Sequence, residues 1–438
     1  MRTSMRIILV VAMLSLTACG IVGGADGGRA QDMAVASEKE RVLPDVPPGD
    51  LSELVEGNTA FAFDLYRLLA EQQEGENLFY SPYSISLALA MAYAGARAET
   101  QEQMAHALRF TLPDERLHSA LNGLDQGLAQ RGEGARGKGE ADEQHPKAFR
   151  LHIANAIWGQ ESYEFLDTFL DTLAANYGAG LRVLDFARAP EDSRVIINDW
   201  ISQQTEGRVQ NLIPQGTIGP LTRLVLTNAV YFSAPWAHPF REAMTEPGAF
   251  TLLDGSQVVV PMMRQAESLG YADGEGYQAV ELPYAGHEMS MVIILPERDR
   301  FDEFESSLDG NRVQEIVSDL TDRQVALRMP TFEFDSRFEL SQALGELGMP
   351  AAFSSAADFS GMTGTTDLFI SDVLHKAFVS VDEQGTEAAA ATAAVIVEGE
   401  ERPADLVTVH VDHPFVLLIR DIETGTILFT GRVLNPRA

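Results

Sequence analysis

Apolar residues in the first half of the chain recur with the spacing of an α-helix. From about Asn58 onward, Phe61, Leu65, Leu68 and Leu69 form one apolar stripe, which is typical of a helix with one buried face. Ser81-Pro82 predicts a second helix start, because serine caps helices and proline suits the first helical position. An apolar helix is expected from there to about residue 94. Two more are expected over 163–177 and 191–204.

The second half of the chain has the composition of β-strands. Its apolar runs are short and rich in β-branched and aromatic residues, which favours strands; they cover 223–232, 289–295, 325–334, 373–381, 407–411, 415–420 and 427–433. Helices followed by strands predict an α+β fold with large antiparallel sheets. Neither an internal repeat nor an interdomain linker follows residue 58, so we expect one domain over 58–438.

The N-terminal residues have the pattern of a lipoprotein leader. Arg2 and Arg6 precede an apolar run that is too short to span a bilayer as a mature helix. The run ends in Leu-Thr-Ala-Cys19-Gly, which resembles the bacterial lipobox, and Cys19 is the single cysteine. We expect 1–18 to be a signal peptide and Cys19 to be lipidated. A plain secretory peptide is the alternative. Residues 19–57, rich in Gly, Pro, Asp, Glu and Ala, are expected to form a flexible linker.

Charge and missing motifs exclude several functions. The formal net charge of −32 argues against binding nucleic acid, which requires a basic surface. Gly132, Gly134 and Gly137 fit a nucleotide-binding pattern, but no expected strand precedes them and the magnesium-binding Ser or Thr is absent. Neither a hydrolase nucleophile elbow nor a helical zinc motif occurs. We expect no enzyme activity, cofactor or metal.

An alanine run follows the strand expected over 373–381. Its composition alone suits a capped helix start, since alanine is the best helix former. A strand leads directly into the run, however, and Val395-Ile396-Val397 follows it. The segment therefore also suits a stretch that changes its conformation.

These residues resemble the hinge of the serpin reactive-centre loop. The resemblance covers Glu383, Gly385, Thr386, Glu387, Ala388, Ala389, Ala390, Ala391 and Thr392. Other segments that resemble serpins follow in family order, at 77–85, 198–213, 227–236, 260–263, 375–377, 412–415 and 431–436. Together they span nearly all of 58–436.

The resemblance implies a serpin fold: a single domain with three β-sheets, about nine helices and an exposed reactive-centre loop. It implies an inhibitor of serine endopeptidases, with cysteine endopeptidases as a second class. The protease's serine attacks the loop and forms an acyl-enzyme, and the cut loop then inserts into the main sheet. In the inserted strand, small residues at 386, 388, 390 and 392 would share one face, with Glu387 on the other.

The resemblance also assigns roles to residues of the central sheet. Ser81, Ser84, Asn228 and His375 match the family's shutter positions, and Trp236 matches the breach region. Ordinary helix capping and core hydrogen bonding explain Ser81 equally well, and both roles can coexist.

The position of the scissile bond is less constrained. Counting about fourteen residues beyond Gly385 places it at Gly399-Glu400. Loop lengths vary in the family, so Val397, Glu398, Glu401 and Arg402 remain alternative specificity residues. The expected partner is a target serine protease held as a covalent acyl complex, with the inhibitor itself a monomer anchored at the periplasmic or outer face of a bacterial envelope. The alternative function is a non-inhibitory serpin that acts as a binding module there.

Lipidation of Cys19 can be tested directly. Cells that express the protein should incorporate radioactive palmitate into it, whereas the Cys19→Ala variant should remain unlabelled because it lacks the acylated thiol. Labelling of the variant would contradict this assignment.

Overall fold

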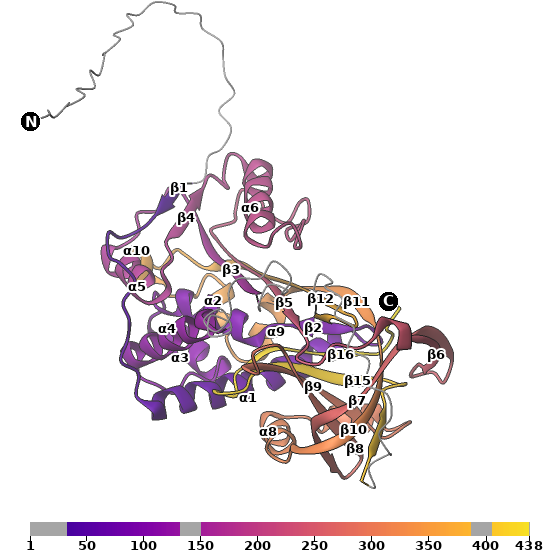
Figure 1. Ribbon diagram of the computed structural model, residues 1–438. Helices are drawn as coiled ribbons and strands as arrows, with labels where there is room; N and C mark the ends of the chain where they lie inside the picture. Colours follow the sequence, from indigo (N-terminus) through magenta and orange to yellow (C-terminus); the bar gives the residue numbers. More distant parts are fainter. Residues whose placement is uncertain (1–32, 132–149, 387–404, 438) are drawn as a thin grey trace, which may run out of the picture.

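The structure, a computed structural model, describes residues 33–131, 150–386 and 405–437. Over these residues the chain forms ten α-helices and sixteen strands. Helices dominate the first part and strands the second (Figure 1), as expected for an α+β fold. None of the helices in these ranges is both long and apolar enough to cross a membrane.

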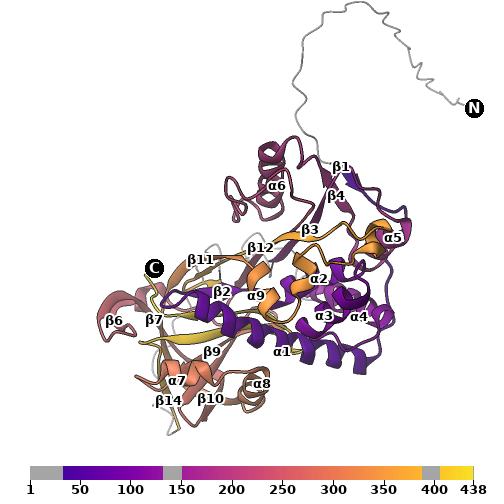
Figure 2. The ribbon, with the colours of Figure 1, turned by 180° about the vertical axis from the view of Figure 1, so that it is seen from behind.

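Five helices from the first part of the chain pack together on one side of the molecule (Figure 2). They are α1 (Pro48–Gln72), α2 (Pro82–Tyr93), α3 (Ala98–Ala107), α4 (Asp114–Gln130) and α5 (Asp167–Tyr177). Helix α2 begins as expected: the Ser81 side chain accepts a hydrogen bond from the Ser84 N–H, and Pro82 occupies the first position. Every residue of α2 is buried, so this helix forms the centre of the core.

A seven-stranded sheet lies over this helical layer. Its strand order is β1-β4-β3-β5-β13-β12-β11, comprising β1 (Met33–Val35), β4 (Leu181–Leu184), β3 (Arg150–Gln160), β5 (Leu224–Pro235), β13 (Gly385–Thr386), β12 (Ile370–Val381) and β11 (Phe332–Glu339). Strand β5 is buried along its whole length. Its even-numbered residues, such as Leu226 and Val230, face the core around α2, whereas Val225 and Ala229 face α6 (Pro190–Gln204) on the other side.

The other nine strands form one continuous hydrogen-bonded sheet, so the described residues contain two sheets where three were expected. The strands are β2 (Leu78–Tyr80), β6 (Glu246–Thr251), β7 (Gln257–Gly274), β8 (Tyr277–Pro283), β9 (Met289–Pro296), β10 (Thr321–Pro330), β14 (Val407–His410), β15 (Phe415–Asp421) and β16 (Ile427–Val433). The cause is β7, which pairs with β6 over 257–262, with β10 over 262–271 and with β8 over 270–274. This one long strand joins two layers that would otherwise be separate.

Short helices fill the connections. They are α7 (Phe301–Ser306), α8 (Gly310–Ser318), α9 (Ser341–Glu346), α10 (Ser360–Thr363), and the 3₁₀ turns η2 (Glu242–Met244) and η3 (Pro350–Phe353). The run over 325–334, expected as one strand, is divided after Pro330. Strand β10 belongs to the nine-stranded sheet and β11 to the seven-stranded sheet.

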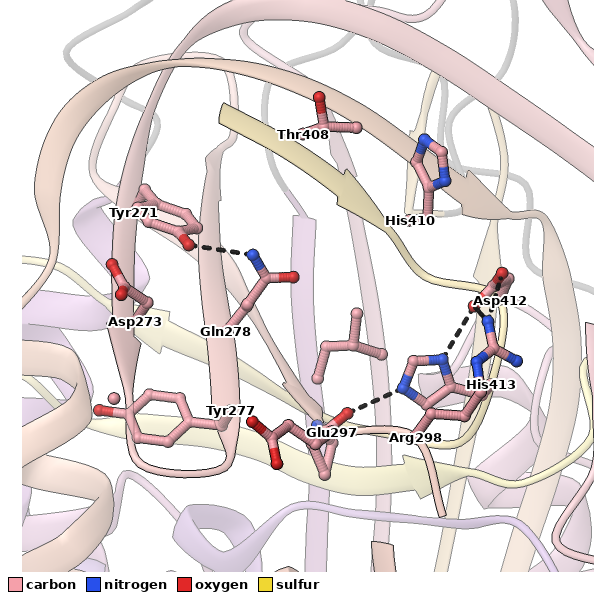
Figure 3. A pocket seen from close by; sticks show the side chains of 13 residues that line it. Tyr271, Asp273, Tyr277, Gln278, Glu297, Arg298, Thr408, His410, Asp412 and His413 are labelled. Carbon is pink, nitrogen blue, oxygen red and sulfur yellow. Dashed lines mark hydrogen bonds and ion pairs between the residues drawn. The ribbon is translucent and has the colours of Figure 1, made fainter. Parts of the chain in front are cut away.

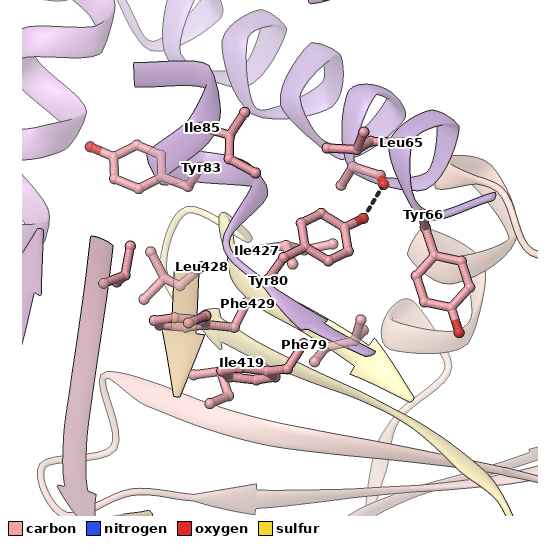
Figure 4. Close-up of a cluster of buried hydrophobic side chains, with 14 of the residues drawn as sticks. Leu65, Tyr66, Phe79, Tyr80, Tyr83, Ile85, Ile419, Ile427, Leu428 and Phe429 are labelled. Carbon is pink, nitrogen blue, oxygen red and sulfur yellow. Dashed lines mark hydrogen bonds between the residues drawn. The ribbon is translucent and has the colours of Figure 1, made fainter. Parts of the chain in front are cut away.

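Aromatic residues join the two halves of the chain into one core (Figure 4). The Phe79 ring of β2 stacks on the Phe429 ring of β16, with 5.0 Å between ring centroids and 3° between ring planes. The Tyr80 hydroxyl donates a hydrogen bond to the Ala62 carbonyl of α1. Because β2 connects α1 to α2, these contacts fix the helical layer against the nine-stranded sheet.

The prediction of a flexible linker over 19–57 is wrong for the described residues, 33–57. Strand β1 pairs antiparallel with β4, and Arg41 donates hydrogen bonds to Asn122 and Asp125 of α4. Helix α1 begins at Pro48, ten residues before the expected domain start at 58. The composition of this segment suits a linker, but Pro47-Pro48-Gly49-Asp50 also suits the first turn of a helix. Proline is favoured at the first helical position, and an acidic residue is favourable near the helix N-terminus.

This correction can be tested by truncation. A chain that begins at residue 58 should melt several degrees below one that begins at residue 33, because it lacks buried Leu54 and Val55, each contributing about 1.5–3 kcal/mol. It also lacks the ion pair between Asp50 and Arg116. Apparent melting temperatures at one scan rate provide the measurement, and equal values would show that 33–57 behave as a linker.

Candidate functional site

The hinge residues lie at the end of the seven-stranded sheet where β12 stops. The chain turns over residues 382–385, and Gly385 and Thr386 then form β13. Thr386 is paired antiparallel with Val381 of β12 on one side and with Ala234 of β5 on the other. Strand β13 therefore lies between β5 and β12, and the described residues stop there until residue 405.

Beyond this entry point, β5 and β12 pair directly with each other. The pairing is parallel, and it runs from Leu224 opposite Ile370 to Val230 opposite Ala377. The two strands are thus separated by β13 at one end and hydrogen-bonded together along the rest. A longer segment can enter between them only if this parallel ladder opens.

Close packing explains why the chain has glycine at position 385. A Cβ atom added there would lie 2.2 Å from the carbonyl oxygen of Ala234 and 2.7 Å from the Cα atom of Pro235. Both are backbone atoms of β5, so they cannot move aside as a flexible side chain could. Only glycine lets the hinge approach β5 at this distance.

Thr386 is buried within an aromatic environment. Its hydroxyl is hydrogen-bonded to the Tyr284 hydroxyl at 2.7 Å, and its side chain is 2% exposed. The Tyr284 ring stacks on Trp236, with centroids 4.7 Å apart and planes at 7°. Burial raises the pKa of Tyr284 far above its usual value, so this phenol stays protonated and available as a hydrogen-bond donor.

Trp236 and its neighbours also hold the turn before Thr386. The Trp236 backbone N–H donates to the Gln384 carbonyl at 2.9 Å, and its indole N–H donates to the Asp382 carbonyl at 3.0 Å. The Thr245 hydroxyl donates to the carboxylate of Glu383. The structure thus brings the expected hinge residues Glu383, Gly385 and Thr386 together with Trp236, which the sequence had assigned separately.

A second polar cluster lies where β5 and β12 pair directly. Asn228 and His375 are opposite each other in the parallel ladder. His375 Nε2 accepts a hydrogen bond from the Ser81 N–H at 3.2 Å, so its Nδ1 carries the proton and donates to the Asn228 side-chain carbonyl. The Asn228 amide donates in turn to the Ser84 hydroxyl. The four expected shutter residues therefore meet in one network.

Ser81 makes a contact that suits each of the two roles that the sequence left open. Its hydroxyl caps α2 through the Ser84 N–H, while its own N–H donates to His375. The start of α2 is thereby connected to the β5–β12 pair.

The network contains a residue that sequence reasoning missed. Asn155 of β3 lies opposite Asn228 of β5. Its side-chain carbonyl accepts hydrogen bonds from Asn228 and Ser84, and its amide donates to the Ser84 carbonyl at 3.1 Å. Tyr284, the partner of Thr386, was missed as well. Neither lies in a segment with a distinctive local pattern, and the register alone brings them into the site.

Burial determines the charge of the shutter histidine. His375 is fully buried, and desolvation lowers the pKa of its imidazole to about 3. The ring is therefore neutral at physiological pH, in agreement with one nitrogen donating and the other accepting. Protonation would remove the acceptor that binds the Ser81 N–H.

Several sequence-based expectations lie outside the described residues. They concern the lipidation site Cys19, the hinge residues Glu387, Ala388, Ala389, Ala390, Ala391 and Thr392, and the reactive-bond residues Val397, Glu398, Gly399, Glu400, Glu401 and Arg402.

A cavity of about 550 Å³ lies elsewhere, beside the ends of β7 and β8 and strand β14 (Figure 3). Some of its charged and polar groups bind each other: Arg298 pairs with Asp412, His413 contacts Asp412, and Gln278 donates to the Tyr271 hydroxyl. Hinge and shutter residues are absent from its lining among the described residues. The cavity is therefore separate from the candidate site.

The neutral state of His375 predicts a dependence of stability on pH. An unfolded histidine takes up a proton near its usual pKa of about 6.5, whereas folded His375 does so only near 3. Stability should therefore fall as the pH drops below about 6.5, by at most about 1.4 kcal/mol per unit for this residue. The apparent melting temperature of His375→Gln should depend less steeply on pH between 7 and 4 than that of the unsubstituted protein.

His106→Gln, at an exposed position of α3, is the matched control. Buried His118, whose pKa desolvation lowers to about 4, contributes a slope of the same sign, which both variants retain. Equal slopes for His375→Gln and the control would contradict the assignment.

Solved structures and relatives agree with this geometry. A crystal structure titled as the thermophilic serpin tengpin in the native state aligns with a TM-score of 0.79 and 28% identity, covering 93% of this chain and all of that one. Uncleaved ovalbumin aligns with a TM-score of 0.76 and 26% identity, covering 88% of this chain and all of its own.

Sequence comparison gives the same result at higher identity. An uncharacterised serpin-like protein of Thermococcus kodakarensis is 35% identical over 99% of both chains. The leukocyte elastase inhibitor of Homo sapiens is 36% identical over 88% of this chain and its own whole length. The family model described as serpin (serine protease inhibitor) matches residues 56–436. This chain therefore belongs to the serpin family of protease inhibitors.

Proposed function

We propose that this protein inhibits serine endopeptidases by inserting its cleaved reactive-centre loop into the seven-stranded sheet. The observation that carries the proposal is the position of β13: Gly385 and Thr386 already lie between β5 and β12 and are paired with both. Family membership and relatives named as leukocyte elastase inhibitors support protease inhibition in general.

The register of β13 supports insertion of the residues that follow it. Continued antiparallel from Thr386, it would place residue 388 opposite Phe232 and Val379, and residue 392 opposite Asn228 and His375. Phe232 and Val379 face the core around α2. The small residues at 386, 388, 390 and 392 would enter that core without overpacking it. Glu387 would face the opposite side, toward the layer that contains α6.

Insertion would exchange one ladder for two. It breaks the parallel β5–β12 pairing and forms two antiparallel ladders, which are slightly more stable per residue. If about ten inserted residues each gain about 0.5–1.5 kcal/mol net, the total is on the order of ten kcal/mol, similar to the stability of a whole domain. This free energy would drive displacement of the acylated protease.

The same geometry supports a kinetic barrier before cleavage. Direct β5–β12 hydrogen bonds and the Asn228–His375 contact must break before a segment can enter. The uncleaved state would then be metastable and would persist because its conversion is slow.

The target protease depends on the scissile bond, for which Gly399-Glu400 is the proposed position. An acidic neighbourhood suits a glutamate-preferring protease, Val397 an elastase-like enzyme and Arg402 a trypsin-like one, although Pro403 would hinder cleavage after Arg402. Incubation with a panel of these proteases, followed by mass spectrometry of the cut loop, identifies the bond.

We further propose that the protein is a lipid-anchored monomer of a bacterial envelope. The support is the leader over 1–18 with Cys19 at the lipobox position. Gly20 follows Cys19 instead of the aspartate that commonly signals inner-membrane retention, which favours the outer membrane.

A charged residue in the hinge should convert the inhibitor into a substrate. The Thr386→Arg variant should be cut by the target protease without forming the covalent complex that survives SDS, since arginine cannot enter the site beside Tyr284. Glu387→Arg is the matched control: it makes the same new side chain one position away, on the face that avoids the core, and should still trap. Trapping by Thr386→Arg would refute the role of the hinge.

Melting of the intact and loop-cleaved protein separates this function from the non-inhibitory alternative. Only a serpin that inserts its loop becomes much more heat-resistant after the cut. Equal melting temperatures before and after cleavage would favour the binding module.

A further inference from the structure

We propose that the turn over residues 382–385 is a register lock for loop insertion and that Asp382 is its positioning residue. The lock would hold the start of the inserting strand in one alignment before any protease arrives. This inference rests on the proposed inhibitory function. It adds a residue, Asp382, to the hinge residues that the sequence had indicated.

The carboxylate of half-buried Asp382 organises the turn from within. One of its oxygens accepts hydrogen bonds from the backbone N–H groups of Gln384 at 2.8 Å and of Gly385 at 3.1 Å. The Asp382 N–H donates to the Gly385 carbonyl at 3.0 Å. These bonds reverse the chain after β12, so that Thr386 returns antiparallel beside Val381.

Groups outside the turn hold it in place. Trp236 donates to the carbonyls of Asp382 and Gln384, and the Phe240 N–H donates to the Glu383 carbonyl at 2.8 Å. All four carbonyls of the turn therefore have a donor. The Tyr284 hydroxyl contacts Thr386 just beyond it, and Tyr284 stacks on Trp236. One aromatic pair thus contacts both the turn and the first inserted side chain.

A fixed register matters because strand side chains alternate between faces. A shift of one residue would turn Thr386 away from the core and direct Glu387 into it. Burying an unpaired carboxylate there is strongly unfavourable, so insertion in the shifted register would stall. The hydrogen bonds of the turn oppose that shift at the residue where insertion begins.

The lock would affect inhibition through the rate of loop insertion. After acylation, insertion competes with hydrolysis of the acyl-enzyme, which releases active protease and cut inhibitor. Because the turn is already formed, the inserting strand is aligned with β5 and β12 before insertion begins. Without the lock, insertion would be slower and a larger share of inhibitor would be consumed as substrate, while the initial attack on the reactive bond, in residues beyond the turn, would keep its rate.

The experiment compares Asp382→Ala and Asp382→Asn with the unsubstituted protein. The protease is the panel member that forms the SDS-stable complex with the unsubstituted chain. Asp382→Ala should raise the number of inhibitor molecules consumed per trapped protease several-fold, with an unchanged rate constant for loop cleavage. Asp382→Asn, which retains an acceptor oxygen, should remain near the original ratio. An unchanged ratio for Asp382→Ala, or an equal rise in Asp382→Asn, would overturn the proposal.

Asp254→Ala is the matched control. Asp254 accepts a hydrogen bond from the Ser256 N–H at 2.9 Å in the exposed turn between β6 and β7, so the substitution removes the same kind of bond away from the hinge. It should leave the ratio unchanged. If it raised the ratio as much as Asp382→Ala does, the effect would not be specific to the hinge and the proposal would fall.

Amide hydrogen exchange tests the lock without a protease. In Asp382→Ala, the amides of Gln384 and Gly385 should exchange roughly tenfold faster or more, because each loses a hydrogen bond to a charged acceptor. Unchanged exchange would overturn the proposal even if inhibition is confirmed. If the unsubstituted chain traps no panel protease and gains no heat resistance on cleavage, the proposed function fails instead.

Discussion

The parallel pairing of β5 with β12 is the interaction on which the rest of the structure depends. It closes the central sheet along Leu224–Val230 and Ile370–Ala377, yet it stops short of the end where β13 lies between the same two strands. The two strands are therefore paired directly along most of their length, whereas β13 already separates them at one end. In the proposed mechanism, opening the ladder replaces its hydrogen bonds with those of an added strand.

The surroundings of this ladder determine how readily it opens. On the core side, Asn228 and His375 connect it to the start of α2 and, through Asn155, to β3. On the other side, α6 covers β3 and β5 with Ile197 and Ile201. Polar contacts of this kind depend strongly on geometry, and they are fully satisfied only while the strands stay together. A closed sheet is thus stabilised by groups outside the ladder itself.

Local patterns predicted the parts of the structure that depend on neighbouring residues. Helices α5 and α6, the cap at Ser81 and most strands of the second half could be recognised from periodicity and turn residues. The N-terminal segment could not, because Pro-Pro-Gly-Asp suits both a linker and a first helical turn. The run over 325–334 was misjudged for a similar reason: Pro330 separates two strands of similar composition that belong to different sheets.

Family resemblance assigned the expected hinge and shutter residues, but not the residues that contact them. Asn155 lies in a strand whose partner is fixed only by pairing with β5. Tyr284 contacts a residue 102 positions away. The hydrogen bonds of Asp382 depend on a turn that Trp236 holds from outside. Contacts between distant segments require the register of the sheet, which a single sequence does not reveal.

The outer strands of the seven-stranded sheet have a consequence for the solubility of the protein. Unpaired backbone groups at a sheet margin can recruit strands from other molecules and so begin aggregation. Strand β1, described over Met33–Val35, pairs with β4 on one margin. On the opposite margin, β11 presents Glu333, Asp335, Arg337 and Glu339 to solvent between its buried residues. A short-period alternation of charged and buried residues makes the β11 margin a poor template for intermolecular pairing.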